Sequence, residues 1–248
     1  MIKTIPLVTS EYSPNDFDLP VLTILRNILY YGLALPVFAL VLLLIPVALI
    51  SMRVGWPLVR GLLKTHLFLL GAVGGVNYEV VGRANLPISP YLIAARHQSI
   101  WETVFFHILL DNPAMLAKDT LFGLPLIGAL MRKNGHIAID RSGSIDAFRR
   151  AVAQAAEVTA SQRSVLIFPQ GTRAKEHNND LKLGVLVLYR KLDCPCVPIV
   201  LNSGDFWPNN SWILRPGTIK IRILPAIETG LTSKEFLARI THDLETTV

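Results

Sequence analysis

The stretch Tyr91-Leu-Ile-Ala-Ala-Arg-His-Gln-Ser-Ile-Trp-Glu102 decides the fold, because a short run of small apolar residues is followed at once by polar residues and a helical pattern. Residues 91–95 are typical of a strand, and residues 100–110 are typical of a helix. A strand that leads directly into a helix is characteristic of α/β folds, which display functional groups at that junction. The stretch therefore predicts both a fold class and the position of a site.

Outward from this stretch, short β-rich runs alternate with helical stretches from residue 77 onward, which predicts a mixed, largely parallel sheet flanked by helices. The last helix is opened by Thr232-Ser-Lys-Glu235, which has the form of a capping box. The expected strands are residues 77–81, 91–95, 114–117, 136–140, 165–168, 196–201 and 219–224. The clearest helices are residues 100–110, 145–160, 181–191 and 234–246.

Residues 28–52 carry no charge and are rich in Leu, Val, Ala and Ile, which predicts a helical segment embedded in a membrane. The first twenty residues include three acidic side chains, so a cleaved signal peptide fits poorly and we expect the segment to be retained. Pro36 and Pro46 each remove a backbone donor and should kink a helix. A straight span and a one-leaflet or re-entrant insertion therefore both remain open.

A second apolar stretch, residues 58–76, is interrupted by Arg60, Lys64 and His66 and is typical of an interfacial helix. Arg53, together with Arg60 and Lys64, favours a cytoplasmic exit of the chain. The composition changes near residue 77. We therefore expect residues 1–76 to be a tail with a membrane-binding helical segment, and residues 77–248 to be the α/β domain.

The composition agrees with a protein that is partly embedded in lipid. The 248 residues are 51% hydrophobic and 17% charged, below the roughly 25% charged of soluble chains. The net charge is +6, but no long basic run or basic-aromatic strip is present, so anionic lipid and substrate are expected rather than nucleic acid. Cys194 and Cys196 do not make a disulfide framework and are expected to be buried thiols.

His97 and Glu102 form the first group that could carry chemistry. Five residues apart in one helix, their side chains would diverge, but with His97 in the preceding loop they could meet. A carboxylate next to one ring nitrogen fixes the tautomer and makes the other nitrogen a better base. Alternatively, Ser99-Ile-Trp-Glu102 is itself a capping box, in which Glu102 would only bind backbone.

The second group is Phe168-Pro-Gln-Gly-Thr-Arg173, again directly after an apolar strand. Gly171 allows close approach of backbone, Thr172 supplies a hydroxyl, and Arg173 can grip a phosphate with two donors. This combination is typical of an anion site. The alternative is a plain turn with a solvated arginine.

Two further groups are less specific. The third runs from Lys118-Asp-Thr-Leu121 through Pro125 and Gly128 to Gly135-His-Ile-Ala-Ile-Asp-Arg141. Its Lys118 and Arg141 follow predicted strands and could add positive charge to the same site. Either could instead be a surface cation, and Asp140-Arg141 could be only a turn. The fourth group, Val197-Pro-Ile199, is an apolar strand whose ordinary explanation is core packing.

Together, these four blocks resemble, in order and spacing, the glycerolipid acyltransferase family, which includes 1-acyl-sn-glycerol-3-phosphate acyltransferases. The resemblance covers roughly residues 91–202. The first motif of that family is His, four residues, then Asp; His97 matches, and Glu102 stands in for the aspartate. The second signature, Phe-Pro-Glu-Gly-Thr-Arg, is met except at Gln170, which cannot carry the negative charge and whose role is left open.

The resemblance implies an enzyme in which His97 takes the proton of an acceptor hydroxyl as that oxygen attacks the thioester of acyl-CoA or acyl carrier protein, while Glu102 orients the imidazole. It implies that Arg173, with Lys118 and Arg141, holds the phosphate of lysophosphatidic acid and that Gly171 and Thr172 shape the loop. The product would be phosphatidic acid for phospholipid biosynthesis, made at the membrane by a catalytic domain on the cytoplasmic face.

No metal and no cofactor is expected, because a thioester is already activated. The sequence also lacks the Gly-x-Ser-x-Gly, His-Glu-x-x-His and Walker motifs of other enzyme classes. Two alternatives remain open. The acceptor could be another lysolipid, such as lyso-ornithine lipid or a lysophospholipid, or the chain could be a non-catalytic lipid-binding module.

Overall fold

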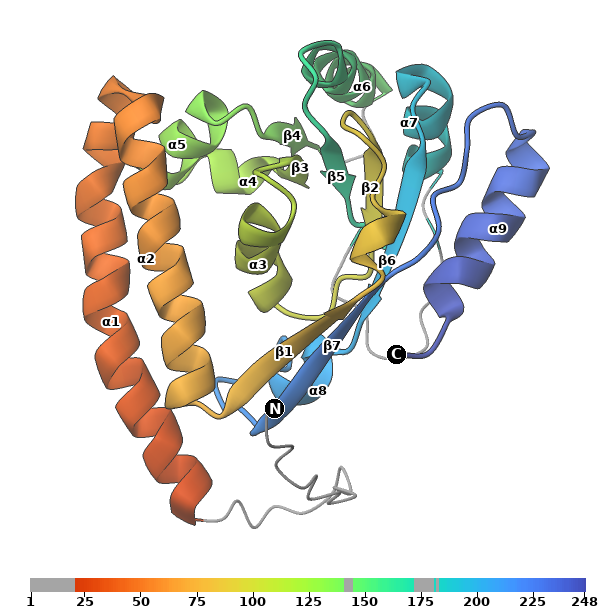
Figure 1. Cartoon of the computed structure of the whole chain (residues 1–248). Coiled ribbons are helices and arrows are strands. Elements are labelled where there is room, and N and C mark those ends of the chain that lie inside the picture. The colour runs from red at the N-terminus through yellow and green to blue at the C-terminus, as the bar shows by residue number, and fades with distance from the viewer. Residues whose placement is uncertain (1–20, 141–144, 172–180, 182) are drawn as a thin grey trace.

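Seven strands form one sheet in the order β1-β7-β6-β2-β5-β3-β4 (Figure 1). The computed structural model describes residues 21–140, 145–171, 181 and 183–248. Neighbouring strands are parallel, apart from the antiparallel pair β6–β7. The bounds are β1 Val76–Val81, β2 Leu92–Ala95, β3 Ala114–Lys118, β4 Ile137–Ile139, β5 Val165–Ile167, β6 Cys196–Leu201 and β7 Gly217–Ile223. The predicted mixed, largely parallel sheet is confirmed.

Helices cover both faces of the sheet. Alternate residues of a strand point to opposite faces, so one strand contributes apolar side chains to the buried clusters on both sides. On β2, Leu92 and Ala94 join the buried cluster beneath helices α6, α7 and α9, whereas Ile93 and Ala95 join the cluster on the side of α3. These helices are α3 Trp101–Leu109, α6 Ile145–Ala160, α7 Gly184–Leu192 and α9 Ser233–Glu245. All four were expected, and the capping box of α9 is present, with the Glu235 N–H donating to Thr232 Oγ1.

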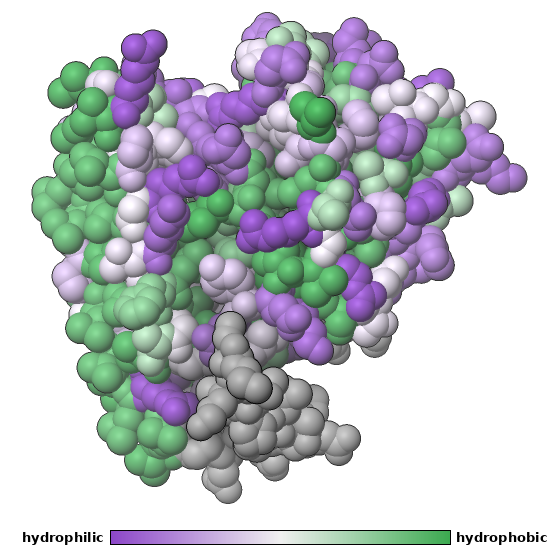
Figure 2. Space-filling view, in the orientation of Figure 1, coloured by the Kyte–Doolittle hydropathy of each residue, from purple (hydrophilic) through white to green (hydrophobic). Residues whose placement is uncertain are grey.

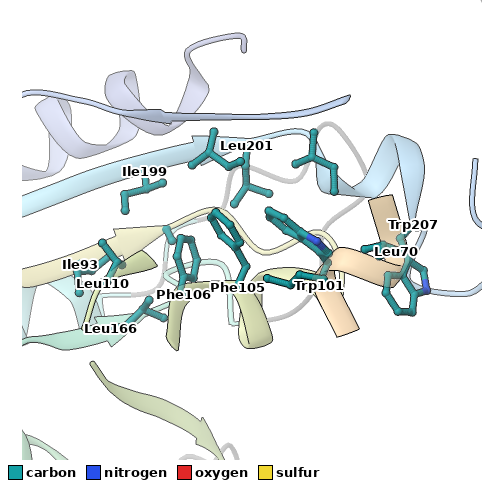
Figure 3. Close-up of a cluster of buried hydrophobic side chains, with 14 of the residues drawn as sticks. Leu70, Ile93, Trp101, Phe105, Phe106, Leu110, Leu166, Ile199, Leu201 and Trp207 are labelled. Atoms are coloured by element: carbon teal, nitrogen blue, oxygen red, sulfur yellow. The ribbon is translucent and has the colours of Figure 1, made fainter. Parts of the chain in front are cut away.

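Helix α3 is fixed by its aromatic face. Trp101, Phe105 and Phe106 are almost fully buried and point toward β2, β5 and β6 (Figure 3). The stacked rings of Trp101 and Phe105 lie 4.3 Å apart between centroids. One side of α3 is therefore held against the sheet, which leaves another side free to line a cavity.

Short helices were not expected from the sequence: η1 Arg83–Asn85, α4 Asp119–Phe122, α5 Ile127–Lys133 and α8 Ser203–Phe206. Such elements are too short to show a helical period. The α4–α5 turn depends on Gly128, where an added Cβ would lie 2.1 Å from the carbonyl oxygen of Phe122. This close approach brings α4 and α5 together beside β3 and β4.

Helices α1 Val21–Ile50 and α2 Met52–Ala72 form a hairpin along one side of the molecule (Figure 1). The expected kinks do not interrupt α1, which runs as one helix through Pro36 and Pro46. The prediction for the second segment was wrong at both ends. Helix α2 begins at Met52 and contains Pro57 as its sixth residue. It ends at Ala72, ahead of Gly75, whose φ is 74°.

Among the described helices, α1 is the one long and apolar enough to cross a membrane. Its large apolar side chains are mostly exposed and form much of the hydrophobic face in Figure 2. Its other side is part of the core, since Tyr30 and Ala34 belong to the same buried cluster as Ile93 and Phe105. The domain boundary at residue 77 stays a prediction, and packing continues across it.

Candidate active site

The side chains of His97 and Glu102 meet where β2 ends and α3 begins. His97 lies in the loop between them, and its Nδ1 is 3.0 Å from Glu102 Oε1. The contact expected from the spacing is therefore present. An ionised carboxylate only accepts hydrogen bonds, so Nδ1 carries the hydrogen of the neutral ring. Nε2 therefore keeps its lone pair and is the basic atom.

The carboxylate of Glu102 is fully enclosed and fully paired. Besides His97, its Oε1 accepts the backbone N–H groups of Gln98 at 2.6 Å and Ser99 at 2.7 Å, and its Oε2 accepts the hydroxyl of Ser203 at 2.8 Å. Glu102 therefore binds both the backbone and the imidazole through one oxygen. This arrangement holds the ring in one orientation. The expected capping box with Ser99 as N-cap is not formed, because the N-cap of α3 is Ile100 and the Ser99 hydroxyl accepts from the Trp101 N–H.

The second motif packs against this pair. The ring of Phe168 stacks on the imidazole of His97 at 4.1 Å between centroids, and the backbone N–H of His97 donates to Gln170 Oε1 at 3.2 Å. Strands β2 and β5 are parallel neighbours, so their carboxyl ends lie together. Gln170 is buried and needs no charge to accept this hydrogen bond.

A cavity of about 1230 Å³ opens beside the His97 ring. Lys118 and Gly171 also line it, as does Asp140 at the end of β4. Its remaining wall is mainly apolar, formed by Ile100, Thr103, Met115, Leu116, Ala117, Leu121, Met131, Ile139, Ile145, Phe148, Ile167, Phe168, Pro169, Leu183 and Gly184, with His107, His136 and Asn209. A cavity of this size and character suits a hydrocarbon chain with a polar end.

The structure therefore brings His97, Glu102, Gly171 and Lys118 to one region. Thr172, Arg173 and Arg141 lie outside the described residues. The described part of the chain contains no group of three or more His, Cys, Asp or Glu residues that could hold a metal ion. The roles of all these residues, and a reaction without metal or cofactor, stay predictions.

Sequence reasoning missed Ser203 and His107, and it assigned no role to His136 within the third block. Ser203 reaches Glu102 from 101 positions along the chain, and no motif surrounds it. His107 could have been noticed, because it falls seven residues after Ile100 on the same side of α3.

Comparisons with known proteins also indicate an acyltransferase. The sequence model of the family described as "Acyltransferase" matches residues 77–202. The 1-acyl-sn-glycerol-3-phosphate acyltransferase of Pseudomonas aeruginosa is 32% identical over 180 residues, which cover 72% of this chain and 70% of that protein. The enzyme of the same name from Saccharomyces cerevisiae is 28% identical over 166 residues, covering 65% of this chain and 55% of that protein.

The fold is also found among solved structures. The crystal structure of the 1-acyl-sn-glycerophosphate (LPA) acyltransferase PlsC from Thermotoga maritima aligns with a TM-score of 0.69 at 19% sequence identity. The alignment covers 89% of this chain and 93% of that one. This likeness shows a shared architecture.

Proposed function

The chain is a member of the acyltransferase family, and from this premise we propose that it transfers a fatty acyl group from acyl-CoA or acyl carrier protein to the hydroxyl of 1-acyl-sn-glycerol-3-phosphate. The product is phosphatidic acid, a precursor in phospholipid biosynthesis. The observation that carries the proposal is the His97–Glu102 pair beside a long, mainly apolar cavity.

His97 acts as the general base. Its Nε2 accepts the proton of the acceptor hydroxyl while that oxygen bonds to the thioester carbonyl carbon. The tetrahedral intermediate then collapses, the C–S bond breaks, and the imidazolium returns the proton to the departing thiolate. Glu102 stabilises the imidazolium between these steps, and because its carboxylate is already fixed by three other donors, no reorganisation is needed. This chemistry needs no metal or cofactor.

The phosphate of the acceptor binds to cationic side chains that follow strands in the sequence. Lys118 lines the cavity, and so does Gly171. Arg173 is two residues beyond Gly171, which limits the separation of their Cα atoms to about 7 Å. Arg141 directly follows Asp140, another lining residue. Gly171 allows close approach of backbone to the phosphate, and Thr172 supplies a hydroxyl for it.

The α1–α2 hairpin attaches the enzyme to lipid with the α/β domain on the cytoplasmic face. The hairpin lies alongside that domain for much of its length (Figure 1). A full crossing by α1 would draw polar surface of the domain toward hydrocarbon, at high cost. Insertion into one leaflet avoids this cost, and it leaves the cavity within reach of lipid substrates.

The proposal is tested by incubating the purified full-length protein with lysophosphatidic acid and labelled acyl-CoA. We expect labelled phosphatidic acid, and we expect His97→Ala to lower kcat by roughly 10²–10⁴-fold, the usual contribution of a general base. Thermal unfolding of the variant should match that of the wild type. Near-normal turnover by folded His97→Ala protein would contradict the assigned role, and the absence of any acyl transfer would support a non-catalytic lipid-binding module.

The acceptor is tested through Arg173. Loss of a charge-assisted hydrogen bond to phosphate should lower kcat/KM for lysophosphatidic acid by roughly 10–100-fold in Arg173→Ala, with little change for monoacylglycerol, which has no phosphate. The matched control is Arg222→Ala, because Arg222 is exposed on β7. An equal loss with both acceptors would contradict phosphate binding by Arg173. Faster use of a lysophospholipid with a full headgroup, or of lyso-ornithine lipid, would favour those acceptors.

A further inference from the structure

The cavity has a second polar end, formed by His107 and His136. Their rings lie 5.1 Å apart between centroids, and both line the cavity. Ile100, Thr103 and His107 follow the helical spacing i, i+3, i+7 and make one stripe along α3. The cavity therefore runs along this helix, from His97 before its first turn to His107 near its last.

A tight hydrogen-bond network holds the two histidines. His107 Nδ1 lies 2.9 Å from Asn112 Oδ1, and the amides of Asn112 and Asn134 bond to each other at 2.9 and 3.1 Å. The backbone N–H of Met115 donates to His136 Nδ1 at 3.1 Å. Among the described residues, His107 Nε2 has no hydrogen-bond partner.

Both rings are uncharged at neutral pH. Burial, as the main cause, lowers the pKa of His107 to about 4 and that of His136 to about 3, and the nearby guanidinium of Arg163 acts in the same direction. That guanidinium is itself held by the backbone carbonyls of Asn112 and Asn134. The two rings at this end of the cavity therefore offer neutral hydrogen-bonding groups.

His107 Nε2 carries a hydrogen and is a donor. Because the Met115 N–H occupies His136 Nδ1, the neutral His136 ring has its hydrogen on Nε2, which lies 3.3 Å from the Asn134 amide. That amide therefore presents its oxygen to His136. If both linked amides are turned over together, their mutual bonds persist and the Asn112 NH2 group donates to His107 Nδ1. A hydrocarbon chain packed here would leave His107 Nε2 unpaired, which is costly. A hydroxyl on the chain satisfies it, because the hydroxyl oxygen accepts the hydrogen bond from Nε2.

We propose that this end of the cavity binds a hydroxyl group on the acyl chain, with His107 Nε2 as its hydrogen-bond partner; the inference rests on the proposed function. From Ile100 to His107 the helix rises by about 10 Å. An extended chain advances about 1.2 Å per bond. The favoured hydroxyl is therefore about eight or nine bonds from the reacting carbonyl, in the middle of a long chain.

The test offers the purified full-length protein lysophosphatidic acid with a set of acyl-CoA donors of equal length. One donor is plain, and the others carry a single hydroxyl at successive positions from carbon 3 to the chain end. We expect kcat/KM to be about fivefold higher for the mid-chain hydroxylated donor than for the plain one, as one added neutral hydrogen bond allows. His107→Phe, which keeps a flat ring between Trp56 and His136, should abolish this preference.

The matched control is His242→Phe, because His242 is exposed on α9 and does not line the cavity. This variant should keep the wild-type preference. If kcat/KM of the wild type is the same for the plain donor and for every hydroxylated donor, the inference is overturned while the proposed function stands. This comparison needs only the wild type, so it decides the matter even if His107→Phe fails to fold. No transfer from any donor would overturn the proposed function, and this inference with it.

Discussion

The two ends of the cavity each present a histidine beside α3, but their surroundings differ. At one end, Nδ1 of His97 bonds to the carboxylate of Glu102. At the other, Nδ1 of His107 bonds to the neutral amide of Asn112, and two arginines, Arg163 and Arg60, contribute to the lowering of its pKa. The ring of His97 can become charged next to an anion, whereas a charge on His107 would be opposed by its environment.

The hydrogen-bond partner of each ring, rather than its position on the helix, therefore decides the chemistry for which the ring is suited. In the proposed mechanism His97 is the base, and a base needs its protonated form stabilised during the reaction. A carboxylate that can do this, Glu102, is bonded to His97 and not to His107. His107 is suited instead to recognition by a neutral hydrogen bond.

The largest effect is expected from a substitution that gives His97 a neutral amide partner, like the one that His107 has. Glu102→Gln keeps the shape and an acceptor for the backbone N–H groups but removes the negative charge. We expect kcat to fall by roughly 10–100-fold, since the imidazolium loses a charged partner in a buried setting. Steady-state kinetics measures this, and unchanged kcat in the folded variant would reduce Glu102 to a helix cap.

The His107 end should affect stability rather than the chemical step. An unfolded histidine has a pKa near 6.5, and the folded values of about 4 and 3 for His107 and His136 lie below it. Between these values the unfolded chain binds protons that the folded chain does not, so the free energy of unfolding falls as pH falls. From pH 6.5 to 5 the loss is up to about 2 kcal/mol for each histidine.

The measurement is the unfolding temperature in detergent at pH 7 and pH 5. The wild type should lose more stability on acidification than His107→Phe, which has one fewer group to protonate. His242→Phe again serves as the exposed-histidine control and should behave as the wild type does. Equal acid sensitivity of the wild type and His107→Phe would contradict the burial of a neutral ring at this end.

The smallest effect is expected from Ser203→Ala, which removes the hydroxyl bound to Glu102 Oε2. We expect kcat to fall by about fivefold, the value of one neutral hydrogen bond, with KM unchanged for both substrates because Ser203 is buried behind the carboxylate. Ser161→Ala, in an exposed position at the end of α6, is the matched control. A change in KM without a change in kcat would exclude a positioning role.

Much of the fold was predictable from local pattern. Each strand begins and ends within two residues of its expected range, because short apolar runs between polar turns are distinctive in an α/β chain. The His97–Glu102 contact was also expected, since both residues belong to one strand–helix junction. The roles of Arg173, Thr172 and Arg141 stay predictions.

The features that sequence reasoning missed depend on contacts between distant segments. Ser203 reaches Glu102 only because β6 lies next to β2 in the sheet. The network around His107 joins the end of α3 to the segment before β4, and neither His107 nor the two asparagines that link these segments belongs to a recognisable motif. Helix α5 is short and depends on a close backbone approach at Gly128, which leaves no periodic signal.

The hairpin of α1 and α2 also limits how a water-soluble form of this protein could be made. Because Tyr30 of α1 and Leu70 of α2 share a buried cluster with Phe105, cutting away the first two helices would strip one wall from the interior. A truncated chain should aggregate in detergent-free buffer rather than yield a soluble enzyme. Crystallisation and assay therefore call for the intact chain in micelles or nanodiscs, where the lipophilic helices remain in place.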